Sequence, residues 1–347
     1  MIISLHGSYF GNNYGDILLM KLYSQWIRDY DPSIKINYPL LKEKNILDPI
    51  DNVSYGLLNL LRSDALVYFG GGYFGEQPVR KVRWSIRNFH RHVVIGLFAI
   101  LFRIPIAIIG VEIGPLSVSW FRKFVLYIAK RANCLIVRNK ESLEYLVEHG
   151  LFNAKLSYDS VLSLSDYVAP NYNCSHTILL HISMVNESVI TLLKSIFIVL
   201  KEQNINNVVF VEDGIGQLSK LKEHGIFDLC DEADIDYKKL EYIGTNRVVD
   251  AINESEMIIT TKMHVGVTGI ALNKKVFSVY THPKIFRLHK QVGNEEFCMA
   301  LNDVDNTIIT RLRGFFNAEN YPMSNDIIEN ARLNRKALLD FICNLKS

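Results

Sequence analysis

The sequence predicts an α/β protein made of two Rossmann-like domains, each a parallel sheet flanked by helices. Three observations predict this class. The chain has 347 residues, enough for two domains that each bury a core. Short β-branched runs alternate with amphipathic helical stretches, which is the pattern of βα units. A segment rich in Ser, Asn and Pro, residues 163–175, separates two such series and is interpreted as a linker.

The first series contains a clear helix among its candidate strands. Residues 17–28 place Leu18, Leu22 and Trp26 at i, i+4 and i+8, which gives one apolar stripe and predicts a helix. Strands are predicted at 2–5, 34–38, 65–69, 105–109, 134–137 and 155–158.

The second series predicts a similar domain followed by a closing helix. Its strands are predicted at 177–181, 207–211, 240–243, 257–260 and 276–279. The predicted organisation is an amino-terminal domain at 1–165, a carboxyl-terminal domain at 176–323 and a closing helix within 324–347. Ligands of doubly wound sheets bind outside the carboxyl ends of the strands, so we expect the site in a cleft between the two domains. Residues that directly follow strands are therefore the site candidates.

Composition excludes several classes of protein. The formal net charge of +2 argues against a general nucleic-acid binder, and 49% hydrophobic residues argue against disorder. The five cysteines form no C-x-x-C pair, which favours reduced thiols over a zinc site or a disulfide framework. The apolar stretch 93–111 is broken by Arg103 and Pro105, so it is interpreted as a helix and a strand rather than a membrane span. The first residues lack a basic leader, and we expect a cytoplasmic protein.

Two glycine-containing segments follow predicted strands in the first half. Gly11-Asn-Asn-Tyr-Gly15-Asp16 precedes the first helix, and Gly70–Gly72 follows the strand at 65–69. Glycines let backbone N–H groups approach a ligand, and a helix N-terminus favours an anion. Asp16 is interpreted either as an N-cap or as a catalytic carboxylate. The triple glycine is interpreted either as a binding loop or as a tight turn.

Cations and a histidine also follow strands. Arg138 follows 134–137, where it either clamps an anion with two hydrogen bonds or pairs with a nearby acid. Lys262 follows 257–260, and Lys284 comes shortly after 276–279. His264 lies in the first turn of a predicted helix, where a bound dianion would favour its protonated form. Its structural alternative is a buried histidine with satisfied hydrogen bonds.

Together these motifs resemble those of the polysaccharide pyruvyl transferases, enzymes that move the enolpyruvyl group of phosphoenolpyruvate onto sugar hydroxyls. The family's G-x-x-N-x-G-D element is similar to residues 11–16, with one residue of slack before the Asn, and its triple glycine is matched at 70–72. Its G-x-G-P-L element is similar to 112–116, with Glu112 in place of the first glycine.

The other two elements of the family lie after later strands. V-R-[DE]-x-x-S is similar to residues 137–142, with Asn139 in place of the acid. S-x-R-L-H followed by Y-x-x-x-K is similar to 260–264 and 280–284, with Lys262 in place of arginine. Lysine keeps the charge but loses the planar two-pronged geometry.

The resemblance implies a ketal pyruvyltransferase with the architecture of the B-type glycosyltransferases. It implies that His264 is the general acid or base and that Asp16 is the partner base. The acceptor is expected to be a sugar with two hydroxyls, in a polysaccharide or its lipid-diphosphate-linked precursor. No cofactor and no metal are expected. The implied phosphoenolpyruvate-binding residues are Arg138, Lys262, Lys284, Asn13, Gly15, Gly71 and Gly72.

Two alternative functions stay open at this point. A glycosyltransferase that uses a nucleotide-sugar would have the same architecture and the same phosphate-friendly loops. A non-enzymatic peripheral membrane protein is the other alternative. It rests on residues 79–103, which contain six Lys or Arg, two His and no acid, with Trp84 and Phe89 beside them. Such a mixture suits the interface of an anionic leaflet. The segment is interpreted either as a peripheral membrane contact through Arg80, Lys81, Arg83 and Arg87 or as an ordinary solvated helix.

Overall fold

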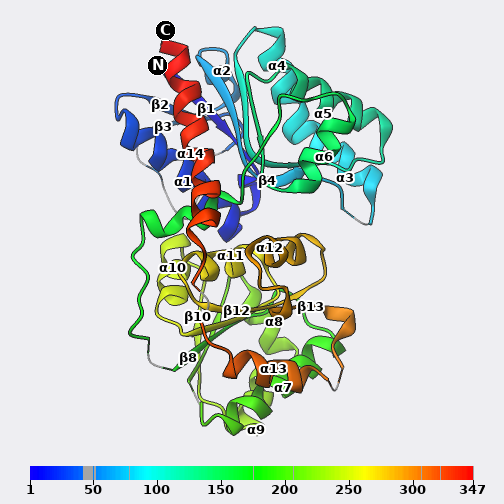
Figure 1. Ribbon diagram of the computed structural model, residues 1–347, viewed down its shortest axis with the longest axis vertical. Helices are drawn as coiled ribbons and strands as arrows, with labels where there is room; N and C mark the ends of the chain where they lie inside the picture. Colours follow the sequence, from blue (N-terminus) through cyan, green and yellow to red (C-terminus); the bar gives the residue numbers. More distant parts are fainter. Residues whose placement is uncertain are drawn as a thin grey trace. The chain divides into compact units, whose positions relative to one another are not determined.

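The computed structural model describes residues 1–41, 50, 52–77, 79–174, 176–205, 207–305, 307–320 and 322–346. It divides into two compact units, Met1–Ser163 with Ile328–Ser347, and Leu164–Ile327 (Figure 1). The carboxyl-terminal helix therefore belongs to the first unit. Residues 175 and 347, predicted to lie in the linker and the closing helix, are outside the described residues.

The first unit is built on a parallel sheet with strand order β3-β2-β1-β4-β5-β6-β7 in the described residues. Its strands are β1 Ile2–His6, β2 Lys35–Tyr38, β3 Val53–Tyr55, β4 Ala65–Phe74, β5 Ile106–Ile113, β6 Cys134–Val137 and β7 Lys155–Leu156. The sequence did not predict β3, because three partly buried residues are too few for an apolar pattern to show. Strands β4 and β5 both run past their predicted ends.

Helices cover both faces of the first sheet. One core joins it to α4 (Val94–Leu101), α5 (Ser119–Arg131) and α6 (Lys140–Glu148). On the opposite face Leu19 and Tyr23 of α1 (Tyr14–Tyr30) contact β4 and β5. Helix α14 (Asn325–Lys346) lies beside α1, where Lys346 pairs with Asp31 (Figure 1). The remaining elements are η1 Tyr9–Gly11, α2 Leu57–Leu60, α3 Lys81–Asn88, the π-helical η3 Phe89–Val93 and η4 Ser160–Asp166.

The second unit repeats this design with strand order β10-β9-β8-β11-β12-β13, again all parallel over the described part. Its strands are β8 Thr177–His181, β9 Asn207–Val211, β10 Tyr237–Leu240, β11 Met257–Thr260, β12 Lys275–Tyr280 and β13 Cys298–Ala300. Strand β10 lies three residues before its prediction, because this edge strand has an exposed Lys-Lys pair in place of an apolar run. β13 was missed because it is only three residues long.

The helices of the second unit also form two layers. One core unites the sheet with α7 Glu187–Glu202, α8 Gln217–Glu223, α9 Ile226–Glu232 and α13 Ile308–Asn317. On the other face Gly269 of α11 packs against β11 and β12, since a Cβ there would meet Ile258 and Val276. This layer contains α10 Thr245–Asn253, α11 Met263–Ala271 and α12 Lys284–Val292, and the short turns η5 Glu295–Phe297 and η6 Leu301–Asp303 follow α12.

Both sheets grow outward from a central strand, first to one side and then to the other. The direction reverses between β1 and β4 in the first unit and between β8 and β11 in the second. This is the doubly wound, Rossmann-like arrangement that the sequence predicts, and the fold class is confirmed. Crevices at such switch points, outside the carboxyl ends of the strands, are where ligands of these sheets bind.

Candidate functional site

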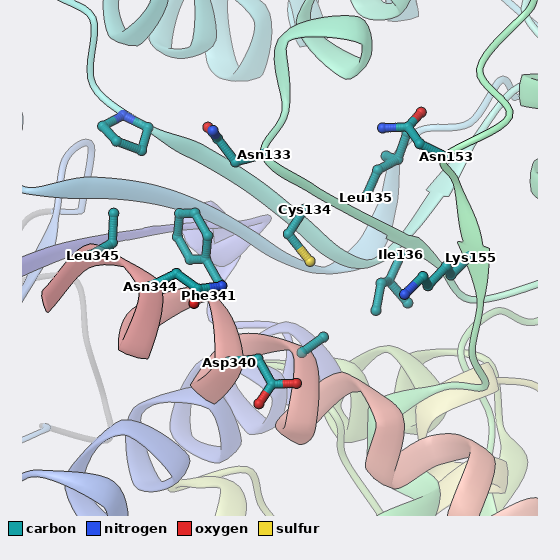
Figure 2. A pocket seen from close by; sticks show the side chains of 12 residues that line it. Asn133, Cys134, Leu135, Ile136, Asn153, Lys155, Asp340, Phe341, Asn344 and Leu345 are labelled. Atoms are coloured by element: carbon teal, nitrogen blue, oxygen red, sulfur yellow. The ribbon is translucent and has the colours of Figure 1, made fainter. Parts of the chain in front are cut away.

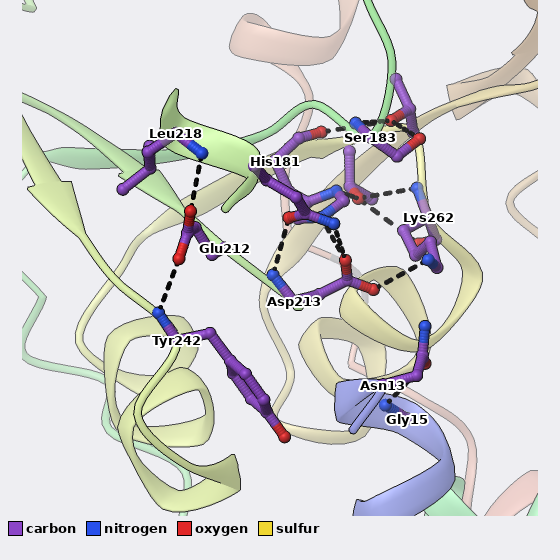
Figure 3. A network of polar contacts seen from close by, with 12 residues as sticks. Asn13, Gly15, His181, Ser183, Glu212, Asp213, Leu218, Tyr242 and Lys262 are labelled. Atoms are coloured by element: carbon purple, nitrogen blue, oxygen red, sulfur yellow. Dashed lines mark hydrogen bonds and ion pairs between the residues drawn. The ribbon is translucent and has the colours of Figure 1, made fainter. Parts of the chain in front are cut away.

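Three charged or titratable side chains meet at the switch point of the second sheet (Figure 3). His181 is the last residue of β8, Asp213 follows β9 by two residues, and Lys262 follows β11 by two residues. Lys262 Nζ lies 3.1 Å from Asp213 Oδ2, and His181 Nε2 lies 3.2 Å from Asp213 Oδ1. Adjacent parallel strands end at one edge, which is why residues so distant in sequence come together.

The three groups differ in their access to solvent. His181 and Asp213 are fully buried, whereas 31% of the Lys262 side chain is exposed. Burial alone would raise the pKa of Asp213, but hydrogen bonding and charge from His181, with the Lys262 ammonium, hold that pKa below its usual range. Asp213 is thus a buried carboxylate that anchors the inner side of a partly exposed cation.

The loop that carries Asp213 is fixed by hydrogen bonds. The Asp213 backbone N–H donates to Gln217 Oε1 at 2.9 Å, and Gln217 Nε2 donates back to Asp213 Oδ1. The neighbouring Glu212 accepts from Leu218 N at 2.7 Å and from Tyr242 N at 3.0 Å (Figure 3). These bonds tie the loop to the start of α8 and to the segment after β10, so the carboxylate of Asp213 has a defined position.

Hydroxyl groups fix the loop that carries Lys262. Thr260 Oγ1 accepts from Lys262 N at 3.0 Å. Thr261 Oγ1 accepts from Ser183 N and shares a hydrogen bond with Ser183 Oγ, both at 2.8 Å. The loops after β8 and β11 are therefore joined directly in front of α11.

The other predicted residues of the second unit lie on the helices that leave this edge. His264 is the second residue of α11 and is buried, and its carbonyl accepts from Thr268 Oγ1 at 2.7 Å. Lys284 is the first residue of α12, and its backbone N–H donates to His282 Nδ1 at 3.3 Å. The structure thus places Lys262, His264 and Lys284 just after β11 and β12, as the sequence predicts.

Arg138 has a different environment in the first unit. Its Nη2 lies 2.6 Å from Glu112 Oε2, and its Nη1 lies 3.2 Å from Asp159 Oδ2. All three side chains are buried. Burial alone would lower the pKa of Arg138, but the charges of Glu112 and Asp159 raise it. The structure therefore supports the ion-pair alternative for Arg138, and its guanidinium is occupied by protein carboxylates.

The triple glycine is part of a strand, so the predicted loop at 70–72 is wrong. β4 continues to Phe74 through a register shift, because Gly70 and Gly71 adopt φ of 37° and 94°, which favour glycine. A Cβ on Gly72 would lie 3.1 Å from both Arg138 Nη2 and Glu112 Oε2. In this structure Gly72 makes room for an internal ion pair.

Asp16 is not the N-cap of α1. Asn13 is the N-cap, and its side chain accepts from Gly15 N at 3.2 Å (Figure 3). Asp16 is a half-buried residue of the first turn, where a carboxylate complements the helix dipole. Its charge also helps to raise the pKa of Arg138, after the larger effects of Glu112 and Asp159. The cap interpretation of Asp16 is wrong, and its catalytic role stays a prediction.

A buried histidine pair lies at the switch point of the first sheet. His6, the last residue of β1, shares hydrogen bonds of 3.0 Å with Tyr9 OH and with His92 Nδ1. Tyr73 stacks on His92 with ring centroids 4.3 Å apart. Burial lowers the pKa of His6 to about 3 and that of His92 well below 6.5. Both imidazoles are therefore neutral parts of an aromatic cluster.

His181 and Asp213 are not among the site residues predicted from the sequence. The signal that marks His181 is a histidine closing the first strand of a βα series, and His6 occupies the same position in the first unit. For Asp213 the signal is the acidic pair Glu212-Asp213 directly after β9. A titratable residue at the carboxyl end of a buried strand, or within two residues after it, is thus the pattern that finds both.

The first unit also contains a hollow of about 620 Å³ at the opposite edge of its sheet (Figure 2). Cys134, Lys155, Asp340 and Phe341 are among its lining residues, at the amino-terminal ends of β6 and β7 and on α14. None of the predicted site residues lines it. In the described chain no group of three His, Cys, Asp or Glu side chains is arranged to hold a metal ion.

Comparisons with known proteins bear on the family and the fold of the chain. A family model described as polysaccharide pyruvyl transferase matches residues 13–283. Two UDP-GlcNAc 2-epimerases have similar structures. The enzyme from Methanocaldococcus jannaschii has a TM-score of 0.64 at 14% identity and covers 98% of this chain and 100% of its own. The enzyme from Neisseria meningitidis has a TM-score of 0.60 at 13% identity and covers 98% and 99%. At such identities the likeness shows the fold alone. No curated protein matches the chain by sequence.

Proposed function

The chain belongs to the polysaccharide pyruvyl transferase family, and from that premise we propose that phosphoenolpyruvate is its donor. The acceptor is one sugar that presents two hydroxyls, within a polysaccharide or its lipid-diphosphate-linked precursor. The product is a pyruvyl ketal, and phosphate is released.

The observation that carries the proposal is the Lys262–Asp213–His181 group at the carboxyl edge of the second sheet. Lys262 is the N-cap residue of α11, its side chain is partly exposed, and its ammonium pairs with a buried carboxylate. A cation at a helix N-terminus suits a small anion such as a carboxylate or phosphate. Phosphoenolpyruvate carries both groups. Lys284, at the start of α12, is proposed as a second contact.

The reaction forms two C–O bonds at C2 of the donor, and each attacking hydroxyl loses one proton. One sugar oxygen bonds to C2 of the donor while the methylene carbon gains a proton and becomes a methyl group. The second oxygen bonds to C2 as the C2–O bond to phosphate breaks. Of the two hydroxyl protons, one balances the methyl group and the other leaves with phosphate. We assign His264 to proton transfer and Lys262 to the charge of the departing phosphate. Asp16 is proposed as the partner base.

Arg138 has a structural role in this proposal. Its guanidinium already pairs with Glu112 and Asp159, so we assign it to the structure of the first unit rather than to the donor. We assign Gly72 a structural role as well, because that glycine accommodates the same ion pair. Asn13 and Gly15 make the N-cap of α1, and Gly71 supports the bulge in β4. The proposed contacts with the donor therefore come mainly from the second unit.

Release of phosphate from phosphoenolpyruvate, measured across a panel of glycan acceptors, tests the proposal. We expect release only with a suitable acceptor, and a mass increase of one pyruvyl ketal on that acceptor. Transfer from a UDP-sugar, with none from phosphoenolpyruvate, would support the glycosyltransferase alternative instead. His264→Ala should lower the rate by about 10²–10⁴ and stay folded. His224→Ala, at an exposed histidine of the same unit, is the matched control.

A further inference from the structure

One face of the first unit combines positive charge with exposed aromatic side chains. Residues 79–131 contain ten Lys or Arg and one acid, Glu112. Glu112 is buried against Arg138, so no exposed side chain in this range is acidic. The total charge of the chain is only +2, and this region is therefore a local concentration of positive charge.

The cations of this region repel one another. Arg83, Arg87 and Arg91 are exposed on α3 and η3. Some burial and the neighbouring charges of Arg91 and Arg83 lower the pKa of Arg87. Lys81 is the exception, because it lies 3.6 Å from Glu76. A surface on which several arginines lie together, despite their mutual repulsion, is suited to a partner with negative charge.

Apolar side chains lie exposed among these cations. On α5, Trp120, Phe124 and Tyr127 are 37%, 38% and 43% exposed, at a spacing that puts them on one side of the helix. Val82 and Ile86 on α3 are also exposed, as are Leu101 and Phe102 at the end of α4. Trp84 is different, since its indole N–H donates to Gly75 O and its ring contacts Arg87.

The structure joins the two helices that carry these groups. Phe89 of η3 contacts both Trp120 and Phe124 of α5, with ring centroids 5.6 and 5.1 Å apart. The basic side chains of α3 and the aromatic stripe of α5 thus border one patch, although they are separated by a strand in sequence. The sequence alone placed only residues 79–103 in such a surface.

We propose that the patch formed by α3, η3, the end of α4 and α5 binds the surface of a bilayer with anionic headgroups. Arginine and lysine would contact the headgroups, and Trp120, Phe124 and Tyr127 would enter the interfacial layer. No described helix is long and apolar enough to span a membrane, so the contact is with one leaflet. The absence of exposed acids favours a bilayer over a second copy, whose identical patch would repel this one.

Co-sedimentation with vesicles tests the proposal. Vesicles of phosphatidylcholine alone are compared with vesicles that also contain phosphatidylglycerol, at low and high salt. The patch variant changes Arg83, Arg87, Lys123 and Arg131 to Gln. The control variant changes Lys194, Lys220, Lys222 and Lys238 to Gln, which removes the same charge from exposed positions of the second unit. A second patch variant, Trp120→Ser with Phe124→Ser, removes the aromatic side chains.

We expect salt-sensitive binding to the anionic vesicles alone. The patch variant should bind at least about 100-fold more weakly, because it lacks four cations that are attracted to the anionic surface. The control variant should bind like the parent, and the aromatic variant should bind more weakly. Equal binding of patch and control variants, or none by the parent, would overturn the proposal. A dimer in solution that the aromatic variant separates would assign the patch to a second copy. The proposal is independent of the donor, because phosphate release with a soluble acceptor should not change in the patch variant.

Discussion

The two sheets share a topology, and their switch points differ in what they offer to a ligand. In the first unit the switch point beside β1 contains His6, His92 and the rings of Tyr9 and Tyr73, all buried. In the second unit the switch point beside β8 contains Lys262, whose side chain is partly exposed and whose ammonium pairs with the buried Asp213. Both edges contain ionisable groups, and at the second switch point Lys262 combines a fully buried counter-ion with a partly exposed side chain.

This difference separates internal ion pairs from binding groups. Arg138 follows a strand, as Lys262 does, and both are charged. Arg138 has two carboxylates within 3.2 Å and 4% exposure, so its charge is used inside the protein. Lys262 has one carboxylate and retains an exposed side. The comparison therefore predicts that Arg138 matters for folding and Lys262 for binding.

The largest effect is expected for Arg138→Met. Removing the cation leaves the buried carboxylates of Glu112 and Asp159 without the guanidinium that neutralises them, which should lower the free energy of unfolding by about 3–5 kcal/mol. Urea unfolding of the parent and the variant measures this difference. Arg62→Met, at an exposed arginine of the same unit, should change stability by less than about 0.5 kcal/mol. A variant as stable as the parent but unable to bind phosphoenolpyruvate would return Arg138 to a role in the site.

Lys262→Met should show the opposite profile. Loss of a cation that stabilises the departing phosphate should reduce kcat/KM for phosphoenolpyruvate by about 10²–10³. The free energy of unfolding should change by less than about 1 kcal/mol, since the Lys262 side chain is partly exposed and His181 stays next to Asp213. Lys262→Arg should keep most of the activity. Steady-state kinetics check both variants, and full activity in Lys262→Met would exclude the residue from the site.

A smaller effect, per unit of pH, is expected from His6. Its pKa is about 3 in the folded protein and 6.5 in the unfolded chain, so the unfolded chain binds more protons between these values. Stability is therefore complete above pH 6.5 and falls by about 1.4 kcal/mol per pH unit as the pH is lowered towards 3. His6→Asn should make the pH dependence less steep by that amount in urea unfolding. An unchanged slope would show that His6 titrates normally.

Asp213, at the second switch point, should not contribute to the loss of stability that begins below pH 6.5. The pKa of Asp213 is lowered, so its stabilising charge persists above pH 3.8 and is lost only below that value. His289, whose pKa burial lowers to about 4, does contribute in the second unit. The contribution of His289 is the same in the parent and in His6→Asn. The difference between their pH dependences of unfolding free energy therefore reports on His6 alone.

The sequence predicted the architecture well, because the strands that form each sheet centre are continuous apolar runs. β6, β8, β9 and β11 were predicted to the residue, whereas the three-residue edge strands β3 and β13 were missed. The extension of β4 depends on positive φ at Gly70 and Gly71, which a run of three glycines permits but does not specify. Local patterns thus predict strands but not bulges.

Single residues of the candidate site were predicted from their positions after strands. Lys262, His264 and Lys284 lie after β11 and β12 as expected, but their roles stay predictions and their surroundings were not predicted. Whether a cation forms an internal ion pair depends on residues far away in sequence, such as Asp159 for Arg138 and Asp213 for Lys262. Those pairings are set by the order of strands in the sheet, which periodicity does not show.

Isothermal titration of phosphoenolpyruvate tests the central claim most directly, because it measures donor binding without an acceptor. The account predicts binding by the parent and by Lys238→Met, an exposed lysine control in the second unit. Lys262→Met should bind at least about tenfold more weakly, which corresponds to about 1.4 kcal/mol. Equal affinities in Lys262→Met and the parent, or no binding by the parent, would contradict the assignment of the donor to the switch point of the second sheet.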